Sequence, residues 1–398
     1  MTRSRLRADR RTVAWLGVAV GVCAALVALP PVEVRSPVAP VVVGLIALTI
    51  GIGSWIRGER RVAGFAIAAG VFGFVIGYLA TRSSVEKLDA VVVWGALFAA
   101  MLRWATPLVF AALGGLFSER SGVVNIGLEG MMLTGAFFAV WGSDVTGTWT
   151  LGLLIGIACG GLMGLLHAFF AISLRADQIV GGTAINFLAL GITTYLFLKI
   201  YGEQGAPTDL STPPDVSLGF LEDIPGIGNF LHDVFGSLDL MIWVAIVLVV
   251  VVWVVVFRTA VGLRLRSVGE HPRAADTVGI NVYAIRYGAV TLSGMLAAAG
   301  GAYLSLGFVS SFDDNMTAGR GFIALAALIF GNWRPFGAAI ACLLFGFSSA
   351  LSDALQEYST SASNLFEALP YVLTLIAVAG VIGRSIPPAS VGRPYVKQ

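Results

Sequence analysis

The chain has 398 residues, of which 57% are hydrophobic and only 12% are charged, and its mean hydropathy is +0.87. Soluble domains carry roughly 25% charged residues, so this composition excludes a soluble globular protein as well as a disordered chain. The net charge of +2 is too small to favour a nucleic acid partner. The sequence therefore predicts an all-α, polytopic transmembrane helical bundle in a lipid bilayer.

Three apolar segments open the chain, at residues 13–32, 38–56 and 62–80. Each has about the 20 residues that a helix needs to cross a hydrocarbon core of about 30 Å. The first follows an arginine-rich start and ends in Pro30 and Pro31 without a small-residue cleavage site, which predicts an uncleaved anchor. Because no motif accompanies these segments, residues 1–90 are interpreted as accessory transmembrane segments.

The working core is predicted at residues 91–385, followed by a cytoplasmic tail at 386–398. The predicted spans of the core are 102–117, 123–141, 150–172, 179–200, 240–257, 287–306, 322–333, 336–351 and 368–383. Together with the three N-terminal segments they give twelve crossings. A run of glycines four residues apart, Gly156, Gly160 and Gly164, predicts close helix packing.

The distribution of charge predicts the orientation of these crossings. Most of the 25 Lys and Arg residues fall in alternate connections, and short cytoplasmic loops hold an excess of such residues. Both termini and the loop 258–286 are therefore predicted to be cytoplasmic, whereas the acidic connection 201–239 is predicted to be extracellular. Four crossings of the core before this connection start from outside, and four after Arg286 start from inside, which is the parity of an inverted repeat.

An acidic residue lies inside one of the predicted spans. In the segment 118–134, SERSGVVNIGLEGMMLT, Glu129 is nine residues past Arg120, roughly 14 Å deep if the segment is helical. Asn125 would then lie one turn away on the same face. One interpretation is that Asn125 and Glu129, with Asn186 of a later span, line a substrate pathway. The other is that they satisfy the backbone of a neighbouring helix.

The cytoplasmic loop 258–286 contains a second candidate site. Its small-residue patch, Ala274 and Ala275, is framed by charges and suits a short helix docked on a soluble partner. The candidate docking residues are Arg266, Glu270, Ala274, Ala275, Asp276 and Gly279. The alternative is an ordinary positively charged connection.

A third candidate site follows at residues 313–333. A polar turn precedes a run of about a dozen apolar residues, which is too short to cross the bilayer comfortably, so a half-helix or re-entrant element that lines a cavity is one interpretation. Asp313, Asn315, Arg320 and Phe322 would form an outer gate there. The alternative is a short packed helix with a solvated acidic turn.

Several of these motifs resemble one transporter family. They are TPL from Thr106, SERSGVVNIGLEGMMLTGA from Ser118, RLRSVGEHPRAADTVGI from Arg264, LSGMLAAAGGAYL from Leu292 and GRGFIALAALIFGNWRPFGA from Gly319. The chain resembles permease subunits of bacterial ABC importers of the branched-chain amino acid and simple sugar group, and it is most similar to the nucleoside-type branch.

The resemblance implies a subunit of the bacterial plasma membrane that imports a small polar solute, with a nucleoside as the expected cargo and a simple sugar or branched-chain amino acid as the alternatives. It also implies three partners: an ABC ATPase subunit that binds ATP and Mg, a second permease subunit, and an extracytoplasmic substrate-binding protein of the kind that can be a lipoprotein. The loop around Glu270 would be the element that couples to the ATPase.

The residues themselves argue against an enzyme. Only three lysines occur, Lys87, Lys199 and Lys397, and none lies in a G-x-x-x-x-G-K-[ST] phosphate loop. No catalytic or metal-binding spacing is found, so no cofactor is expected on this chain. A transporter of another class, coupled to an ion gradient through Glu129, remains the alternative.

Overall fold

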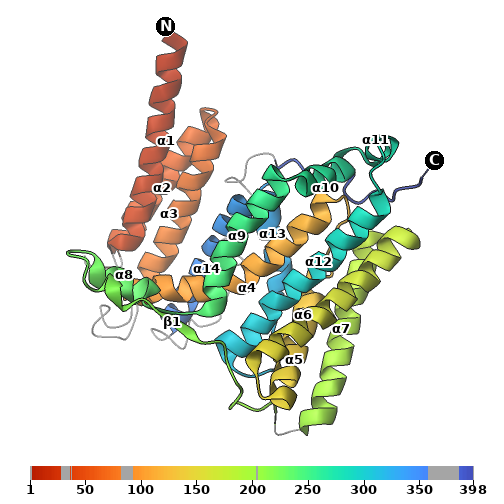
Figure 1. Ribbon diagram of the computed structural model, residues 1–398. Coiled ribbons are helices and arrows are strands. Elements are labelled where there is room, and N and C mark those ends of the chain that lie inside the picture. Colours follow the sequence, from red (N-terminus) through yellow and green to blue (C-terminus); the bar gives the residue numbers. More distant parts are fainter. Residues whose placement is uncertain are drawn as a thin grey trace. The chain divides into compact units, whose positions relative to one another are not determined.

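The computed structural model describes residues 2–27, 36, 38–81, 93–202, 205–356 and 385–397. The chain forms two compact units (Figure 1). Residues 1–101 and 347–385 make up the first unit, and residues 102–346 and 386–398 make up the second. Each unit is considered by itself below.

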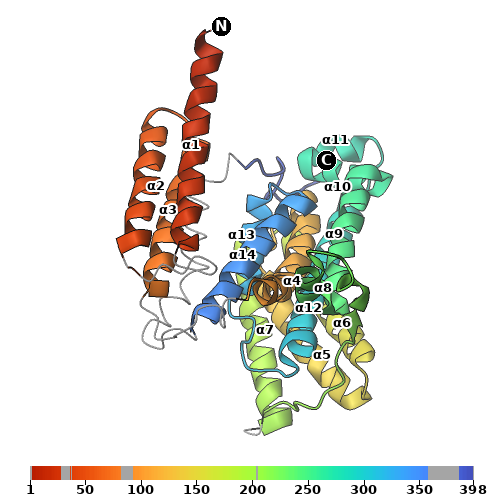
Figure 2. The same cartoon turned by 90° about the vertical axis from the view of Figure 1, so that its left-hand side faces the viewer.

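The first unit contains a bundle of three helices, α1 (Thr2–Leu26), α2 (Val38–Ile56) and α3 (Arg60–Thr81), which pack side by side (Figure 2). Small residues allow this packing. A Cβ on Gly21 of α1 would lie only 2.6 Å from the backbone nitrogen of Gly70 in α3. The second and third predicted segments match α2 and α3 closely, whereas α1 begins well before the predicted apolar run.

The second unit holds the remaining helices. They are α4 (Trp94–Arg120), α5 (Leu128–Thr146), α6 (Trp149–Ala168), α7 (Gln178–Tyr201), α8 (Gly228–Phe235), α9 (Leu240–Arg258), α10 (Ala260–Glu270), α11 (Pro272–Thr277), α12 (Val282–Ala302), α13 (Arg320–Phe330) and α14 (Pro335–Gln356). The first turns of α4 and the last turns of α14 belong to the first unit. Both α6 and α12 end in a π-helical turn, at Phe169–Ser173 and Tyr303–Val309.

The centre of this unit is formed by α5, α6 and α12, which contact one another along their lengths (Figure 1). Glycines at these contacts bring the backbones together. A Cβ on Gly156 of α6 would lie 2.7 Å from the carbonyl oxygen of Gly135 in α5, and one on Gly164 would lie 2.8 Å from that of Val290 in α12. The predicted close packing at the glycine run of α6 is thereby confirmed.

We expect Gly160→Ala to lower the thermal stability of the protein markedly. The added methyl would overlap the Cβ of Ala298 and lie 2.9 Å from the carbonyl oxygen of Gly294, and such overpacking costs about 1–3 kcal/mol. Gly191→Ala in α7 is the matched control, because its Cβ meets no atom within 4 Å. Melting curves of the two variants in detergent should differ by several degrees, and equal curves would contradict the packing.

The acidic connection after α7 is folded in the part that the structure describes. It contains a two-stranded antiparallel sheet, β1 (Asp215–Ser217) and β2 (Ser237–Asp239), which flanks α8. Asp239 caps α9 by accepting a hydrogen bond from the backbone N–H of Met241 at 2.6 Å. Burial raises the pKa of Asp239 to about 6, and the nearby Asp215 acts in the same direction.

Seven of the described helices are long and apolar enough to cross a membrane, a criterion of length and composition. They confirm a polytopic helical membrane protein and include α7 and α9 with bounds within two residues of prediction. The predicted span 368–383 lies outside the described residues, so the twelve crossings and the inverted repeat stay predictions. Helix α13 has 11 residues, which is short of a crossing, as expected.

Candidate functional site in the membrane core

The connection between α4 and α5 is a buried, non-helical segment. Helix α4 ends at Arg120 and α5 begins only at Leu128. Gly122 has a φ of +95°, and its Cβ would lie 2.8 Å from Nη2 of Arg286, so glycine is required there. The segment is not helical between Arg120 and Leu128, so the depth of Glu129 and its shared face with Asn125, which held only for a helix, are wrong.

Side chains from three other helices hold this segment by its backbone. His167 of α6 places Nε2 3.0 Å from the carbonyl oxygen of Val124, and Gln178 of α7 accepts from the N–H of Val124 at 2.7 Å. Arg286 of α12 donates from Nε to the carbonyl oxygen of Ser121 at 3.1 Å. A buried loop must have its backbone polar groups paired, and these polar side chains supply the partners that a helix would otherwise provide.

Asn186 of α7 also holds this segment, at the start of α5. The four side chains that bind its backbone are called the polar clamp below: His167, Gln178, Asn186 and Arg286. Oδ1 of Asn186 accepts from the N–H of Gly130 at 2.8 Å, and its Nδ2 donates to the carbonyl oxygen of Ile126 at 3.1 Å. The N–H of Gly130 belongs to the first turn of α5 and has no partner within that helix. Both ends of the Asn186 amide thus contact backbone.

Asn125 lies fully buried within the segment. Its Nδ2 donates to Oγ of Ser293 in α12 at 2.9 Å, while its Oδ1 has no hydrogen-bond partner among the described residues. An unpaired buried acceptor costs about 1–3 kcal/mol. Asn125 is therefore the one of the three predicted pathway residues that retains an open hydrogen-bonding position in the described structure.

Glu129 caps the short helix α13. One carboxylate oxygen, Oε1, accepts from Oγ1 of Thr317 at 2.6 Å and from the N–H of Gly319 at 2.8 Å, and Oε2 accepts from the N–H of Gly321 at 2.6 Å. A carboxylate at a helix N-terminus also interacts favourably with the helix dipole. The second sequence interpretation, that the acid satisfies the backbone of a neighbouring helix, describes these contacts.

The turn before α13 contains the expected outer gate residues. Asp313 and Asn315 are exposed, and Asn315 has a φ of +55°. Arg320 donates from Nη1 to the carbonyl oxygens of Met316 and Thr317, so it holds the turn rather than extending from it. Phe322 is exposed on α13.

The loop 258–286, predicted to be cytoplasmic, folds into α10 and α11, with Pro272 at the first position of α11 and Gly279, at a φ of +85°, just after it. The expected docking patch is corrected in one respect. Ala275 is 3% exposed and packs in a cluster with Val268, Val282 and Tyr395, whereas Ala274 is exposed. The two alanines cannot lie on one surface, because adjacent residues of a helix such as α11 point to different faces.

The charged members of this loop contact the chain itself. The guanidinium of Arg266 lies 5.1 Å from the ring centre of Phe257. Glu270 accepts from the N–H of Ala389 at 3.1 Å, and Asp276 accepts from the hydroxyl of Tyr395 at 2.9 Å. Burial, followed by this hydrogen bond, raises the pKa of Tyr395 above its ordinary value.

The C-terminal segment 385–397 forms a strap that lies beside α10 and α11 (Figures 1 and 2). Ser390 donates from its backbone N–H to the carbonyl oxygen of Gly269 at 2.9 Å, and Gly392 donates to that of Gly122 at 3.3 Å. Arg286, only 2% exposed, donates from Nη1 to the carbonyl oxygen of Arg393 at 3.1 Å. Arg286 and the strap therefore join the loop 258–286 to the segment 121–127.

A second contact joins α4 to the turn after α13. Arg120 donates from Nε and Nη2 to the carbonyl oxygen of Trp333 at 3.0 and 2.7 Å, and the indole N–H of Trp333 donates to Glu119. Sequence reasoning missed this contact, together with Gln178, Ser293, Thr317 and the strap. The available signal was a polar side chain within or next to an apolar run, which identifies a polar residue but not its partner.

These features define a class of protein: a polytopic helical membrane protein with a polar clamp in its core and a folded loop between α9 and α12. Residues 97–378 match the family described as branched-chain amino acid transport system / permease component. The chain belongs to this family and is a multi-pass permease subunit of an ABC transporter in the plasma membrane. Family membership decides against the ion-coupled alternative.

Several curated relatives are similar over most of their length. The guanosine ABC transporter permease protein NupQ of Bacillus subtilis is 45% identical over 78% of this chain and 99% of its own. The nucleoside ABC transporter permease protein NupC of Lactococcus lactis subsp. cremoris is 41% identical over 76% and 96%. The putative glucose ABC transporter permease protein TsgC13 of Haloferax volcanii is 40% identical over 67% of this chain and 78% of its own. No solved structure matches.

Proposed function

We propose that the chain forms half of the membrane pathway of an ATP-driven importer that carries a nucleoside into the cell. The similarity to NupQ over 99% of that permease, which is named for guanosine, carries this proposal. A partner ATPase subunit binds ATP and Mg, a second permease subunit completes the pathway, and an extracytoplasmic binding protein delivers the solute.

The coupling loop transmits the movement of the ATPase to the core. Its exposed residues on α11 and just after it, Arg273, Ala274, Thr277 and Val278, form the surface that meets the ATPase. Val278 is 75% exposed, so its apolar side chain is available for a protein contact. Arg266, Glu270 and Asp276 hold the loop in shape through the contacts described above, and Gly279 ends α11.

The polar residues of the core act by positioning the elements that line the pathway. Asn186 holds α5, and Glu129 holds α13, so a shift of α12 and the strap reaches both helices through the clamped segment. In this group, Asn125 has an unpaired Oδ1 that can accept a hydrogen bond in another conformation. The turn at Asp313 and Asn315, with Arg320 and Phe322 of α13, gates the outer side.

The experiment is uptake of radiolabelled guanosine by the assembled transporter in vesicles that contain ATP. We expect unlabelled nucleosides to compete, and glucose and leucine to have no effect. The similarity to TsgC13 makes a sugar the second candidate, and competition by glucose alone would establish it. Uptake that requires a proton gradient and persists without ATP would overturn both assignments.

A further inference from the structure

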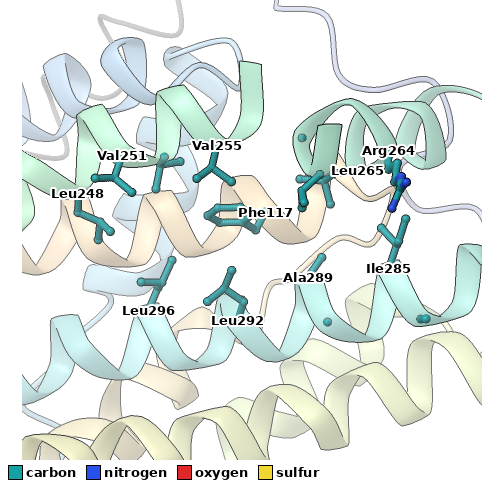
Figure 3. Close-up of a pocket in the computed structure, with 15 residues that line it drawn as sticks. Phe117, Leu248, Val251, Val255, Arg264, Leu265, Ile285, Ala289, Leu292 and Leu296 are labelled. Carbon is teal, nitrogen blue, oxygen red and sulfur yellow. The ribbon is translucent and has the colours of Figure 1, made fainter. Parts of the chain in front are cut away.

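An apolar groove of about 500 Å³ opens between α9, α10 and α12, with Phe117 of α4 at its floor (Figure 3). Leu248, Val251 and Val255 of α9 face Leu292 and Leu296 of α12 across it. Gly288 lies in its wall, and a Cβ there would meet no atom within 4 Å. The groove is therefore a true gap in helix packing that no described side chain fills.

The groove has the length of one membrane leaflet. Along α12 its lining runs from Ala284, near the cytoplasmic start of the helix, to Leu296, a rise of about 18 Å. One leaflet of the hydrocarbon core is about 15 Å thick. A transmembrane helix of another subunit would need a groove along both leaflets, whereas the acyl chains of a lipid need only this one.

Arg264 of α10 lies at the cytoplasmic end of the groove and is its only charged lining residue (Figure 3). The neighbouring arginines have protein partners: the guanidinium of Arg258 lies 5.0 Å from the ring centre of Trp253, and that of Arg266 lies over Phe257. No described residue forms an ion pair with Arg264, and its side chain is exposed. A cation at the headgroup level above an apolar groove attracts an anionic lipid.

We propose that this groove binds an anionic glycerophospholipid of the cytoplasmic leaflet, with its acyl chains between α9 and α12 and its phosphate at Arg264. A single arginine near the membrane surface contributes about 1 kcal/mol of attraction for anionic lipid, which corresponds to about a fivefold preference over a zwitterionic lipid. The bound lipid would stabilise α9 against α12 next to the coupling loop.

The test places a benzophenone amino acid at Val251 in the assembled transporter, in vesicles of equimolar phosphatidylglycerol and phosphatidylcholine. After irradiation, mass spectrometry identifies the crosslinked partner. We expect phosphatidylglycerol to be captured about five times as often as phosphatidylcholine. Arg264→Gln should bring this ratio to about one, and Gly288→Leu should reduce capture of both lipids at least threefold by filling the groove.

Matched variants control for general effects. Arg258→Gln removes a nearby arginine, at the C-terminal end of α9, that does not line the groove. Gly191→Leu adds the same side chain at an equally open glycine position on α7. Both should keep the fivefold preference. A crosslink from Val251 to another protein subunit, or an unchanged lipid ratio in Arg264→Gln, would overturn the proposal.

Discussion

Replacing Glu129 by alanine should abolish uptake and lower the thermal stability of the assembled transporter by several degrees. The carboxylate accepts hydrogen bonds from the Thr317 hydroxyl and from the N–H groups of Gly319 and Gly321, all at 2.8 Å or less. Each buried donor left without an acceptor costs about 1–3 kcal/mol. The start of α13 would lose its cap, and the turn that contains Asn315 would lose its anchor.

Two further variants separate capping from solute binding. Glu129→Gln keeps one acceptor oxygen but presents an NH2 group to one of the donors, so we expect an intermediate loss of stability. Thr317→Val removes a single partner and should cause a smaller loss of the same kind. The exposed acid Asp314, changed to asparagine, is the control. If Glu129→Gln raised the KM for the solute without lowering the melting temperature, Glu129 would be a solute ligand instead.

Replacing Arg286 by methionine should uncouple ATP hydrolysis from uptake. The buried guanidinium bridges the carbonyl oxygens of Ser121 and Arg393, and the methionine side chain fills a similar space without either hydrogen bond. The strap and the clamped segment would then move independently of α12. We expect the number of solute molecules imported per ATP hydrolysed to fall at least tenfold, while ATP hydrolysis itself continues.

Lysine at position 286 provides a graded comparison, because it keeps the charge but cannot present two donors in the planar arrangement of a guanidinium. Arg286→Lys should therefore be intermediate. Tyr395→Phe, which removes only the hydroxyl that contacts Asp276, should have a weaker effect of the same kind. Arg393→Gln is the control, since only the backbone of Arg393 contacts Arg286. Normal coupling in Arg286→Met would show that the bridge is only structural.

Particular residues show how far sequence reasoning reached. Apolar length predicted α7 and α9 almost to the residue, since a span must satisfy its own backbone over the whole hydrocarbon core. The short run before Trp333 counts among the predicted crossings although its length also suggests a half-helix, and the structure forms a helix of 11 residues there. By contrast, the segment after Arg120 contains Gly122, Asn125 and Gly127, which indicate a turn and a bend but do not show that all of residues 121–127 leave the helix.

The basic residues also separate what the sequence predicts from what only the packing decides. Arg120 and Arg286 were assigned to the cytoplasmic side as part of the charge asymmetry, yet both make hydrogen bonds inside the protein to carbonyl oxygens distant in sequence. A charge count predicts the side of the membrane because it depends only on position along the chain. Which acceptor a guanidinium reaches depends on how distant segments pack.

The sequence by itself determined that this chain is a membrane protein of many helices, approximately where most of them lie, and which family its motifs resemble. Those properties follow from local hydrophobicity and charge, because each segment partitions into the bilayer according to its own composition. Only the tertiary structure decided that Glu129 caps α13, that Ala275 is buried while Ala274 is exposed, and that the C-terminal strap contacts the loop 258–286. The contacts of Glu129 with α13 and of the strap with this loop join residues more than a hundred positions apart, and only the packing of the helices brings them together.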